Sequence, residues 1–273
     1  MKLKALLKTF AALLIALLAL YAGRVLGLYL IGGIFSHNGV NADNLANASE
    51  WIGYLAENAD AIANLCALMC GVCACLFLKD MFSKRTEGFK LKYVYLLPLG
   101  AVPGYMLVNL LKSADEIRMP LTRSFGNPIA WANLILFCCL NALLMRSCVC
   151  EGLKTAFSKS FAIGASALAE AAFLPYICYG SFSALLVING LLLGGLMGYV
   201  YFKTGSVLPE IFICTGFTLG HRLLGGYPDG GAYYVSNNII TGGEVGITGS
   251  VTLTLLIAIA CALIAYGERR RLK

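Results

Sequence analysis

The sequence has few charged residues, and they are missing from long uninterrupted segments. Only 13% of the 273 residues are Asp, Glu, Lys or Arg, whereas 59% are hydrophobic. A typical soluble domain is about one quarter charged and about half apolar. Because segments of about 20 residues lack charge almost entirely, we interpret them as transmembrane helices. The composition therefore favours an integral membrane protein with several spans.

Two further absences narrow the functional class. No segment outside the apolar runs combines basic with aromatic residues, so the net charge of +7 does not predict a nucleic-acid partner. The long loops at 35–57 and 227–248 contain none of the 11 cysteines, so a disulfide framework is not expected. No internal repeat, low-complexity linker or soluble domain is visible. We therefore expect residues 1–273 to form a single domain embedded in the lipid bilayer.

The apolar segments predict an all-α fold, a polytopic transmembrane helical bundle of about eight spans. The first segment follows a basic start that resembles a signal peptide, but no clear small-residue cleavage site follows it. We interpret it as an uncleaved first span. The predicted spans lie near 9–34, 59–79, 93–111, 127–146, 160–179, 182–202, 207–224 and 249–266.

The distribution of Lys and Arg predicts the orientation of the bundle. With eight spans, most basic residues fall on one side of the membrane, and this side is expected to be cytoplasmic. The protein would then be a multi-pass protein of the cell membrane with both termini in the cytoplasm. Besides the C-terminal ERRRLK, the basic residues on this side are Lys2, Lys4, Lys8, Lys79, Lys84, Arg85, Lys90, Lys92, Arg146, Lys154, Lys159 and Lys203.

The most specific pattern in the chain runs from Leu191 to Thr218. It reads LLLGGLMGYVYFKTGSVLPEIFICTGFT: a Gly-rich helix, an aromatic-basic-Thr-Gly-Ser turn and a Pro-containing start of the next helix. With this pattern the second half of the chain, about residues 128 to 222, resembles the CAAX protease and bacteriocin-processing (CPBP, also called Abi) family of intramembrane proteases. The resemblance implies N-terminal spans at 1–126, a CPBP-like core at 127–224, and an outer loop with the last span at 225–273.

Two of the family's catalytic motifs fall on the fourth and fifth predicted spans. The Glu-Glu-x-x-x-Arg motif falls on NALLMR, where Asn141 and Ala142 take the Glu positions and Arg146 retains the Arg. The Phe-x-x-x-His motif falls on AEAAF, with Ala169 at the Phe position and Phe173 at the His position. Of the polar residues in these two motifs, Arg146 alone is retained.

The third motif, His-x-x-x-Asn, falls on CTGFT, with Cys214 and Thr218 at the two polar positions. In the family that the chain resembles, two His and a Glu hold a divalent metal such as zinc, or Glu and His activate a water directly. Neither the His residues nor the Glu residues are present here. A single thiolate does not provide the three protein ligands of a catalytic zinc site. We therefore interpret Cys214 and Thr218 as packing residues and predict no metal or other cofactor.

Acidic residues within a predicted span are costly and often functional. Glu170 lies midway along the fifth span and, three residues before Phe173, would face the family's cavity. It is a candidate relocated acid, acting as a proton carrier, metal ligand or substrate contact, or alternatively the partner of a buried Arg. Arg24 is expected to pair with Glu170 or Glu210, or to extend to the interface. Glu210 suits a helix N-terminus.

Several other residues have a simpler interpretation. The cysteines of CALMCGVCAC, Cys66 to Cys75, are expected to pack as small apolar residues. Cys148 and Cys150 follow the predicted fourth span, where S-acylation would be feasible. His221 is expected to be an interfacial residue, because a metal site made from His221 and Glu170 lacks a third ligand.

Two functional hypotheses follow from the sequence. The chain is either a catalytically degenerate CPBP relative that binds peptides, prenylated tails or partner membrane proteins, or an active intramembrane protease with a non-standard, zinc-dependent site. The active protein would be of the CAAX type or would process or confer immunity to bacteriocins. The missing Glu and His favour the first hypothesis and leave enzymatic activity open. A transporter or channel is disfavoured, because paired broken helices and several intramembrane charges are lacking.

Overall fold

The computed structural model describes residues 2–41, 44–82, 93–114, 117–118, 128–178, 183–222, 233–234, 239–240 and 248–271. Most of the predicted outer loop at 227–248 lies outside these residues. Within them the fold is helical, as the composition predicts, apart from two antiparallel strands of two residues each, β1 (Ile117–Arg118) and β2 (Tyr233–Tyr234).

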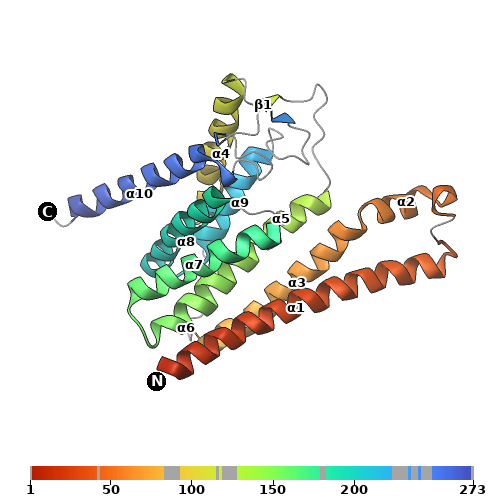
Figure 1. The fold of residues 1–273 in the computed structure, drawn as a ribbon, viewed down its shortest axis with the longest axis horizontal. Helices are drawn as coiled ribbons and strands as arrows, with labels where there is room; N and C mark the ends of the chain where they lie inside the picture. Colours follow the sequence, from red (N-terminus) through yellow and green to blue (C-terminus); the bar gives the residue numbers. More distant parts are fainter. Residues whose placement is uncertain are drawn as a thin grey trace.

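Each of the eight predicted spans coincides with a long helix (Figure 1). The fourth of them is a continuous helix in three parts, in which α5 passes through the π-helical segment η3 into α6. Two short helices, η1 (Leu45–Asn47) and α2 (Glu50–Glu57), connect the first two long ones. The long helices are α1 (Lys2–His37), α3 (Ala59–Phe82), α4 (Leu96–Ser113), α5 (Pro128–Ala142) with η3 (Leu143–Cys150) and α6 (Glu151–Lys154), α7 (Lys159–Cys178), α8 (Ala184–Thr204), α9 (Leu208–Arg222) and α10 (Val251–Arg271).

Four of these helices are long and apolar enough to cross a membrane. Among the described residues they are Lys2–His37, Ala59–Phe82, Pro128–Lys154 and Ala184–Thr204. Shorter apolar helices occur at Leu208–Gly220 and Val251–Gly267. The structure thus supports a membrane protein with at least this set of candidate spans.

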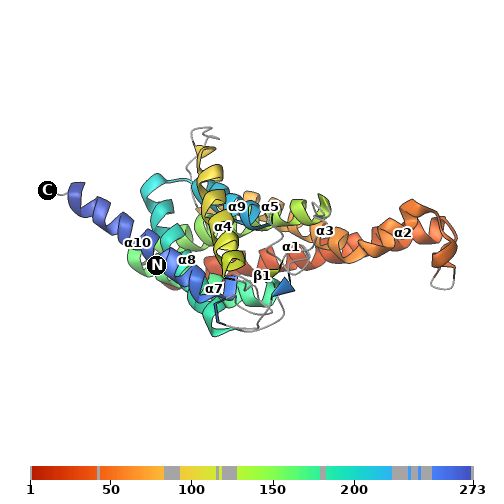
Figure 2. The same ribbon diagram turned by 90° about the horizontal axis from the view of Figure 1, so that it is seen from above.

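The helices form a central bundle from which two parts project. The α1–α3 hairpin, with α2 at its tip, extends beyond the end of α5, and α10 leaves the bundle on the opposite side (Figures 1 and 2). Large apolar side chains are exposed on both projections, including Tyr29 and Trp51 on the hairpin and Leu263 on α10. Such surfaces are expected of helices that face lipid.

Glycine allows α4 and α9 to pack with their backbones in contact. A Cβ atom at Gly216 would lie 2.0 Å from the carbonyl oxygen of Leu97, and one at Gly220 would lie 2.1 Å from that of Ala101. From the other side, a Cβ at Gly100 would lie 2.3 Å from the Ile213 carbonyl oxygen. Small residues at a crossing are the usual means of close helix association in membranes. This contact fixes α9 beside the bundle core.

The Thr-Gly-Ser turn predicted from the sequence connects α8 to α9. Gly205 ends α8 with φ 68°, in the left-handed region that glycine adopts without strain. Ser206 then accepts a hydrogen bond through Oγ from the Leu208 amide at 3.3 Å, where α9 begins. The turn sets the position of Glu210 in the first turn of α9.

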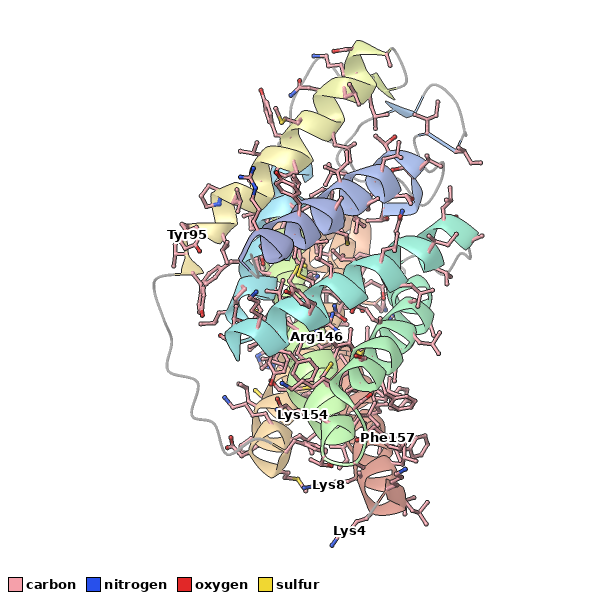
Figure 3. All side chains as sticks on the ribbon, turned by 90° about the vertical axis from the view of Figure 1, so that its left-hand side faces the viewer. Lys4, Lys8, Tyr95, Arg146, Lys154 and Phe157 are labelled. Atoms are coloured by element: carbon pink, nitrogen blue, oxygen red, sulfur yellow. The ribbon has the colours of Figure 1, made fainter. Side chains whose placement is uncertain are left out.

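The apolar core surrounds the long fourth helix. Leu144, Met145 and Val149 of η3 are buried there against Ala16 of α1 and Cys75 of α3. This helix continues to Lys154, beyond the predicted end of the fourth span at residue 146. Arg146 therefore lies inside a helix in the middle of the bundle and is not a loop residue at the membrane surface, which corrects the sequence-based prediction (Figure 3).

Candidate functional site: a buried arginine–glutamate cluster

Arg146 has 0% of its surface exposed, and its side chain is one of the largest that are fully buried in the part of the chain that the structure describes. It lies in η3, where the backbone winds more widely than in an α-helix. In a regular α-helix, residues five positions apart point about 140° away from each other. The wider winding of η3 turns Arg146 toward the same neighbour as Asn141. π-Helical segments of this kind are frequent at functional sites.

Two carboxylates share the guanidinium group of Arg146. Glu210 binds it at two points: Nε donates to Oε2 at 2.7 Å and Nη2 donates to Oε1 at 3.0 Å. Nη2 also donates to Oε2 of Glu170 at 2.5 Å. Both carboxylates are buried, with 1% of Glu170 and 2% of Glu210 exposed. The ion pairs join the fourth long helix to α7 and α9.

Asn141 completes the cluster from α5. Its Nδ2 donates to Oε1 of Glu170 at 2.8 Å, so that both oxygens of Glu170 accept a hydrogen bond. Together with Glu210, this gives four carboxylate oxygens, each with a nitrogen donor. Such pairing is what a low-dielectric interior requires of buried charge.

Two further polar side chains occupy the remaining side of the guanidinium. Nη1 of Arg146 donates to Ser166 Oγ at 3.2 Å, and Ser166 in turn donates to the Ile163 carbonyl at 3.0 Å. The Cys150 thiol lies 3.0 Å from the same hydroxyl. On the α8 side, a Cβ at Gly194 would lie 2.7 Å from Glu170 Oε2, so that only glycine fits here. The cluster is therefore enclosed by four helices.

The motif positions identified from the sequence are thus only partly brought together. Asn141, Arg146 and Glu170 form the direct contacts described above, whereas Ala142 is fully buried in the apolar core. The side chains of Phe173 and His221 lie outside the described residues. The alternative interpretation of Glu170, as a partner of a buried Arg, agrees with these contacts.

Cys214 and Thr218 are placed on α9, one and two turns beyond Glu210. Thr218 donates through Oγ1 to the Cys214 carbonyl at 2.8 Å. This hydrogen bond lies within the helix, so the Thr218 hydroxyl donates to its own backbone and not to the cluster. Cys214 is half-buried and within electrostatic range of Glu170, Glu210 and Arg146. That Cys214 and Thr218 serve for packing stays a prediction.

Two sequence-based interpretations are corrected by the structure: the pairing of Arg24 with Glu170 or Glu210, and the acylation of Cys148 or Cys150. Arg24 does not reach either glutamate, because it lies on the α1–α3 hairpin, where Nη2 is 3.2 Å from Asp60 Oδ1 and Nη1 is 3.2 Å from Asn64 Oδ1. Cys148 and Cys150 are not accessible to acylation, because η3 continues the helix and buries both completely.

Sequence reasoning also missed that Glu210 is the partner of Arg146: it placed Glu210 at a helix N-terminus or as one of two possible partners of Arg24. Counting the charges would have identified this pair. A buried Arg in a membrane bundle needs an anionic partner, and Glu170 and Glu210 are the acids within the predicted spans of this half of the chain. Ser166 and Cys150 carried no such signal.

No group of three or more His, Cys, Asp or Glu side chains could hold a metal ion within the part of the chain that the structure describes. The cluster contributes two acids, and the Arg146 guanidinium occupies the place between them where a cation would have to bind. The residues present therefore do not fit a catalytic zinc ion.

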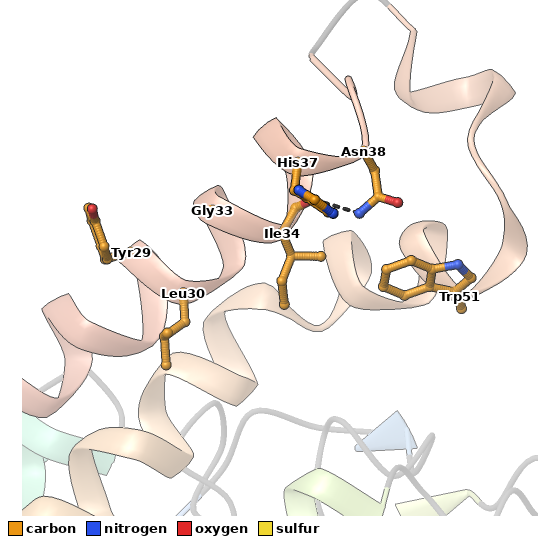
Figure 4. Close-up of a pocket in the computed structure, with 7 residues that line it drawn as sticks. All are labelled: Tyr29, Leu30, Gly33, Ile34, His37, Asn38 and Trp51. Carbon is orange, nitrogen blue, oxygen red and sulfur yellow. Dashed lines mark hydrogen bonds between the residues drawn. The ribbon is translucent and has the colours of Figure 1, made fainter.

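A separate hollow of about 470 Å³ opens near the tip of the α1–α3 hairpin (Figure 4). Its lining is almost entirely apolar and comes from the end of α1, which carries Ile34 and His37, and from Trp51 of α2. It contains none of the motif positions. The residues that line it are Tyr29, Leu30, Gly33, Ile34, His37, Asn38 and Trp51.

Comparison with known proteins adds no relative to this description: no family model, no curated protein and no solved structure matches the chain. The likeness to the CPBP family is therefore carried by the turn at 201–206 and by the motif positions alone.

Proposed function

We propose that this chain is a catalytically degenerate membrane protein of CPBP-like architecture, which binds a hydrophobic or prenylated peptide segment, free or within a partner membrane protein, without cleaving it. The proposal includes eight membrane crossings, with both termini in the cytoplasm of the cell. The coincidence of each predicted span with a long helix supports this topology.

The observation that carries the proposal is the burial and pairing of both carboxylates in the cluster. Arg146 donates hydrogen bonds to both oxygens of Glu210 and to Oε2 of Glu170, and Asn141 donates to Oε1 of Glu170. A general base must lie within reach of the water that it activates, but only 1% of Glu170 and 2% of Glu210 are exposed, so both carboxylates are closed off from solvent. Turning either carboxylate toward a water would break a buried ion pair, which costs about 3–5 kcal/mol.

The family-equivalent positions nearest to the cluster still offer a surface for binding. Asn141 and Cys214 are half-buried, whereas the charged groups between them are sealed. The helices that carry them, α5 and α9, pack against each other. A hydrophobic peptide lying along this seam would contact amide and thiol side chains in place of a hydrolytic centre.

Binding can be tested with a fluorescent farnesylated peptide and its unprenylated counterpart, added to the purified protein in lipid nanodiscs. We expect saturable binding of at least one peptide and no cleavage product in mass spectra. Cys214→Phe should weaken binding at least tenfold by filling the seam. Cys261→Phe, on a half-buried position of α10, is the matched control. Cleavage, or equal affinity in both variants, would disprove the proposal.

One observation favours a second candidate, an active intramembrane protease with a relocated acid. Glu170 contacts Asn141, and so places a carboxylate beside the position that Glu occupies in the family motif. This candidate requires stoichiometric zinc in the purified protein and cleavage that is lost in Glu170→Gln. Absence of both would exclude it.

A further inference from the structure

Lysines from several elements gather at one end of the bundle, which we name the basic end. They come from the first two turns of α1, the last turn of α3, the end of α6, the start of α7 and the last turn of α8. Figure 3 shows three of them, Lys4, Lys8 and Lys154, at the end of the molecule opposite to the top of α4. The basic end consists of Lys2, Lys4, Lys8, Lys79, Lys154, Lys159 and Lys203.

Direct contacts hold these elements together at this end. Lys8 Nζ donates to the Met81 carbonyl at 2.5 Å, which ties α1 to the end of α3. A Cβ at Gly152 would lie 2.3 Å from Thr9 Oγ1, so α6 packs closely on α1. The Tyr201 hydroxyl donates to Glu151 Oε1 at 3.1 Å and brings in α8. The lysines therefore occupy one continuous surface.

Several of these lysines lie over aromatic rings. Lys2 Nζ is 5.8 Å from the Phe157 ring centroid and Lys8 Nζ is 4.9 Å from that of Phe82. Lys203 Nζ is 5.8 Å from the Tyr199 centroid. A ring holds an ammonium group at a fixed depth through its electron-rich face. Tyr concentrates at the level of the lipid headgroups, which places the Lys203–Tyr199 pair there, and the two Lys–Phe pairs lie at the same end of the bundle.

The surface is strongly positive after its ion pairs are counted. Glu151 is buried and accepts hydrogen bonds from Lys154 at 3.2 Å through both oxygens, so these two charges cancel. Among the described residues at this end, Asp80 of α3 is the remaining acid. Five of the other lysines thus face a single exposed carboxylate: Lys2, Lys4, Lys8, Lys79 and Lys159.

We propose that the basic end is a binding surface for the headgroups of anionic phospholipids. Amines held on aromatic rings at a bilayer boundary match the depth and charge of a lipid phosphodiester. Positive charge at this level is attracted by anionic lipid with about 1 kcal/mol per Lys, or about fivefold in affinity. The inference does not depend on the proposed function, since it involves neither the Arg146 cluster nor the α5–α9 seam.

The experiment titrates the purified full-length protein in neutral detergent micelles with phosphatidylglycerol or phosphatidylcholine and follows the thermal unfolding midpoint. We expect a saturable rise with phosphatidylglycerol and little change with phosphatidylcholine. The double variant Lys2→Gln/Lys8→Gln should raise the apparent dissociation constant about 25-fold, five times for each lysine. Lys2→Arg/Lys8→Arg should retain the wild-type value.

The matched control is Lys112→Gln, at an exposed position in the last turn of α4, outside the basic end. It should leave the titration unchanged. Equal stabilisation by both lipids would overturn the proposal, as would an equal loss of affinity in Lys112→Gln. Inorganic phosphate is titrated in parallel: a comparable rise with phosphate would show a site for free anions and would likewise overturn the assignment to lipid.

Discussion

Removing Arg146 should destabilise this protein more than removing any other charged side chain that the structure describes. Arg146→Met keeps the length and apolar stem of the side chain but leaves Glu170 and Glu210 buried without their shared cation. Loss of one partner of a buried ion pair typically costs about 3–5 kcal/mol. Because two carboxylates lose their partner here, we expect the upper end, about 5 kcal/mol. This equals the whole stability of many domains.

A triple variant separates the effect of charge from that of shape. Arg146→Met/Glu170→Gln/Glu210→Met removes all three charges at nearly constant volume. Gln at position 170 keeps an oxygen for Asn141 Nδ2, and Ser166 keeps its bond to the Ile163 carbonyl. Replacing a buried ion cluster by uncharged groups of similar size is often neutral or stabilising. We therefore expect the triple variant to lie within about 1 kcal/mol of the wild type.

The assay is reversible unfolding by sodium dodecyl sulfate in mixed micelles, followed by circular dichroism. Arg24→Met serves as the control, because its pair with Asp60 at 3.2 Å is exposed at both side chains. Exposed pairs contribute less than about 1 kcal/mol. Our interpretation is refuted if Arg146→Met costs no more than Arg24→Met, or if the triple variant is as unstable as Arg146→Met.

Three further outcomes follow from the packing. Gly216→Ala should lower the free energy of unfolding by about 1–3 kcal/mol, because the new Cβ would lie 2.0 Å from the Leu97 carbonyl oxygen. Gly195→Ala is the control and should leave stability unchanged, because nothing lies within 4 Å of its Cβ position. Equal thermal midpoints for the two variants would contradict the α4–α9 contact. Tyr201→Phe deletes the hydroxyl that donates to buried Glu151 and should cost about 1.5 kcal/mol in the same unfolding assay; an unchanged midpoint would argue against this bond. A chelator should leave the thermal midpoint unchanged, since the described residues include no set of metal ligands; a fall in the midpoint would reveal a bound metal.

The helices were predictable from the sequence because the bilayer imposes a simple rule. An apolar segment must satisfy its backbone internally, so its length and lack of charge predict a helix with little dependence on tertiary contacts. The predicted spans at 59–79 and 182–202 correspond to Ala59–Phe82 and Ala184–Thr204 within a few residues. The turn around Gly205 was equally readable, because a Thr-Gly-Ser sequence between two apolar runs leaves few alternatives.

The partners of the charged residues were not predictable in the same way. The prediction that Arg24 pairs with Glu170 or Glu210 treated every intramembrane charge as available to every other, but α1 pairs with α3 and keeps Arg24 on the hairpin. The end of the fourth span was also placed too early, because Arg146 was interpreted as a surface charge. In the structure, η3 winds through this position and buries it. Neither error could be removed without knowing how the helices pack.

Arg146 connects the two arguments about this protein. It is the polar motif residue that supports the resemblance to a protease family, and it is also the group that occupies the acids a protease would need. A guanidinium is always charged and cannot leave a dry interior without its counter-ions. Because Asn141 and Ala142 stand at the Glu positions of the motif, the positive charge of Arg146 must be neutralised by acidic residues from other helices. Glu170 and Glu210 provide that balance. The same pairing that makes the bundle stable therefore supports our proposal of binding without cleavage, because cleavage would require these ion pairs to separate.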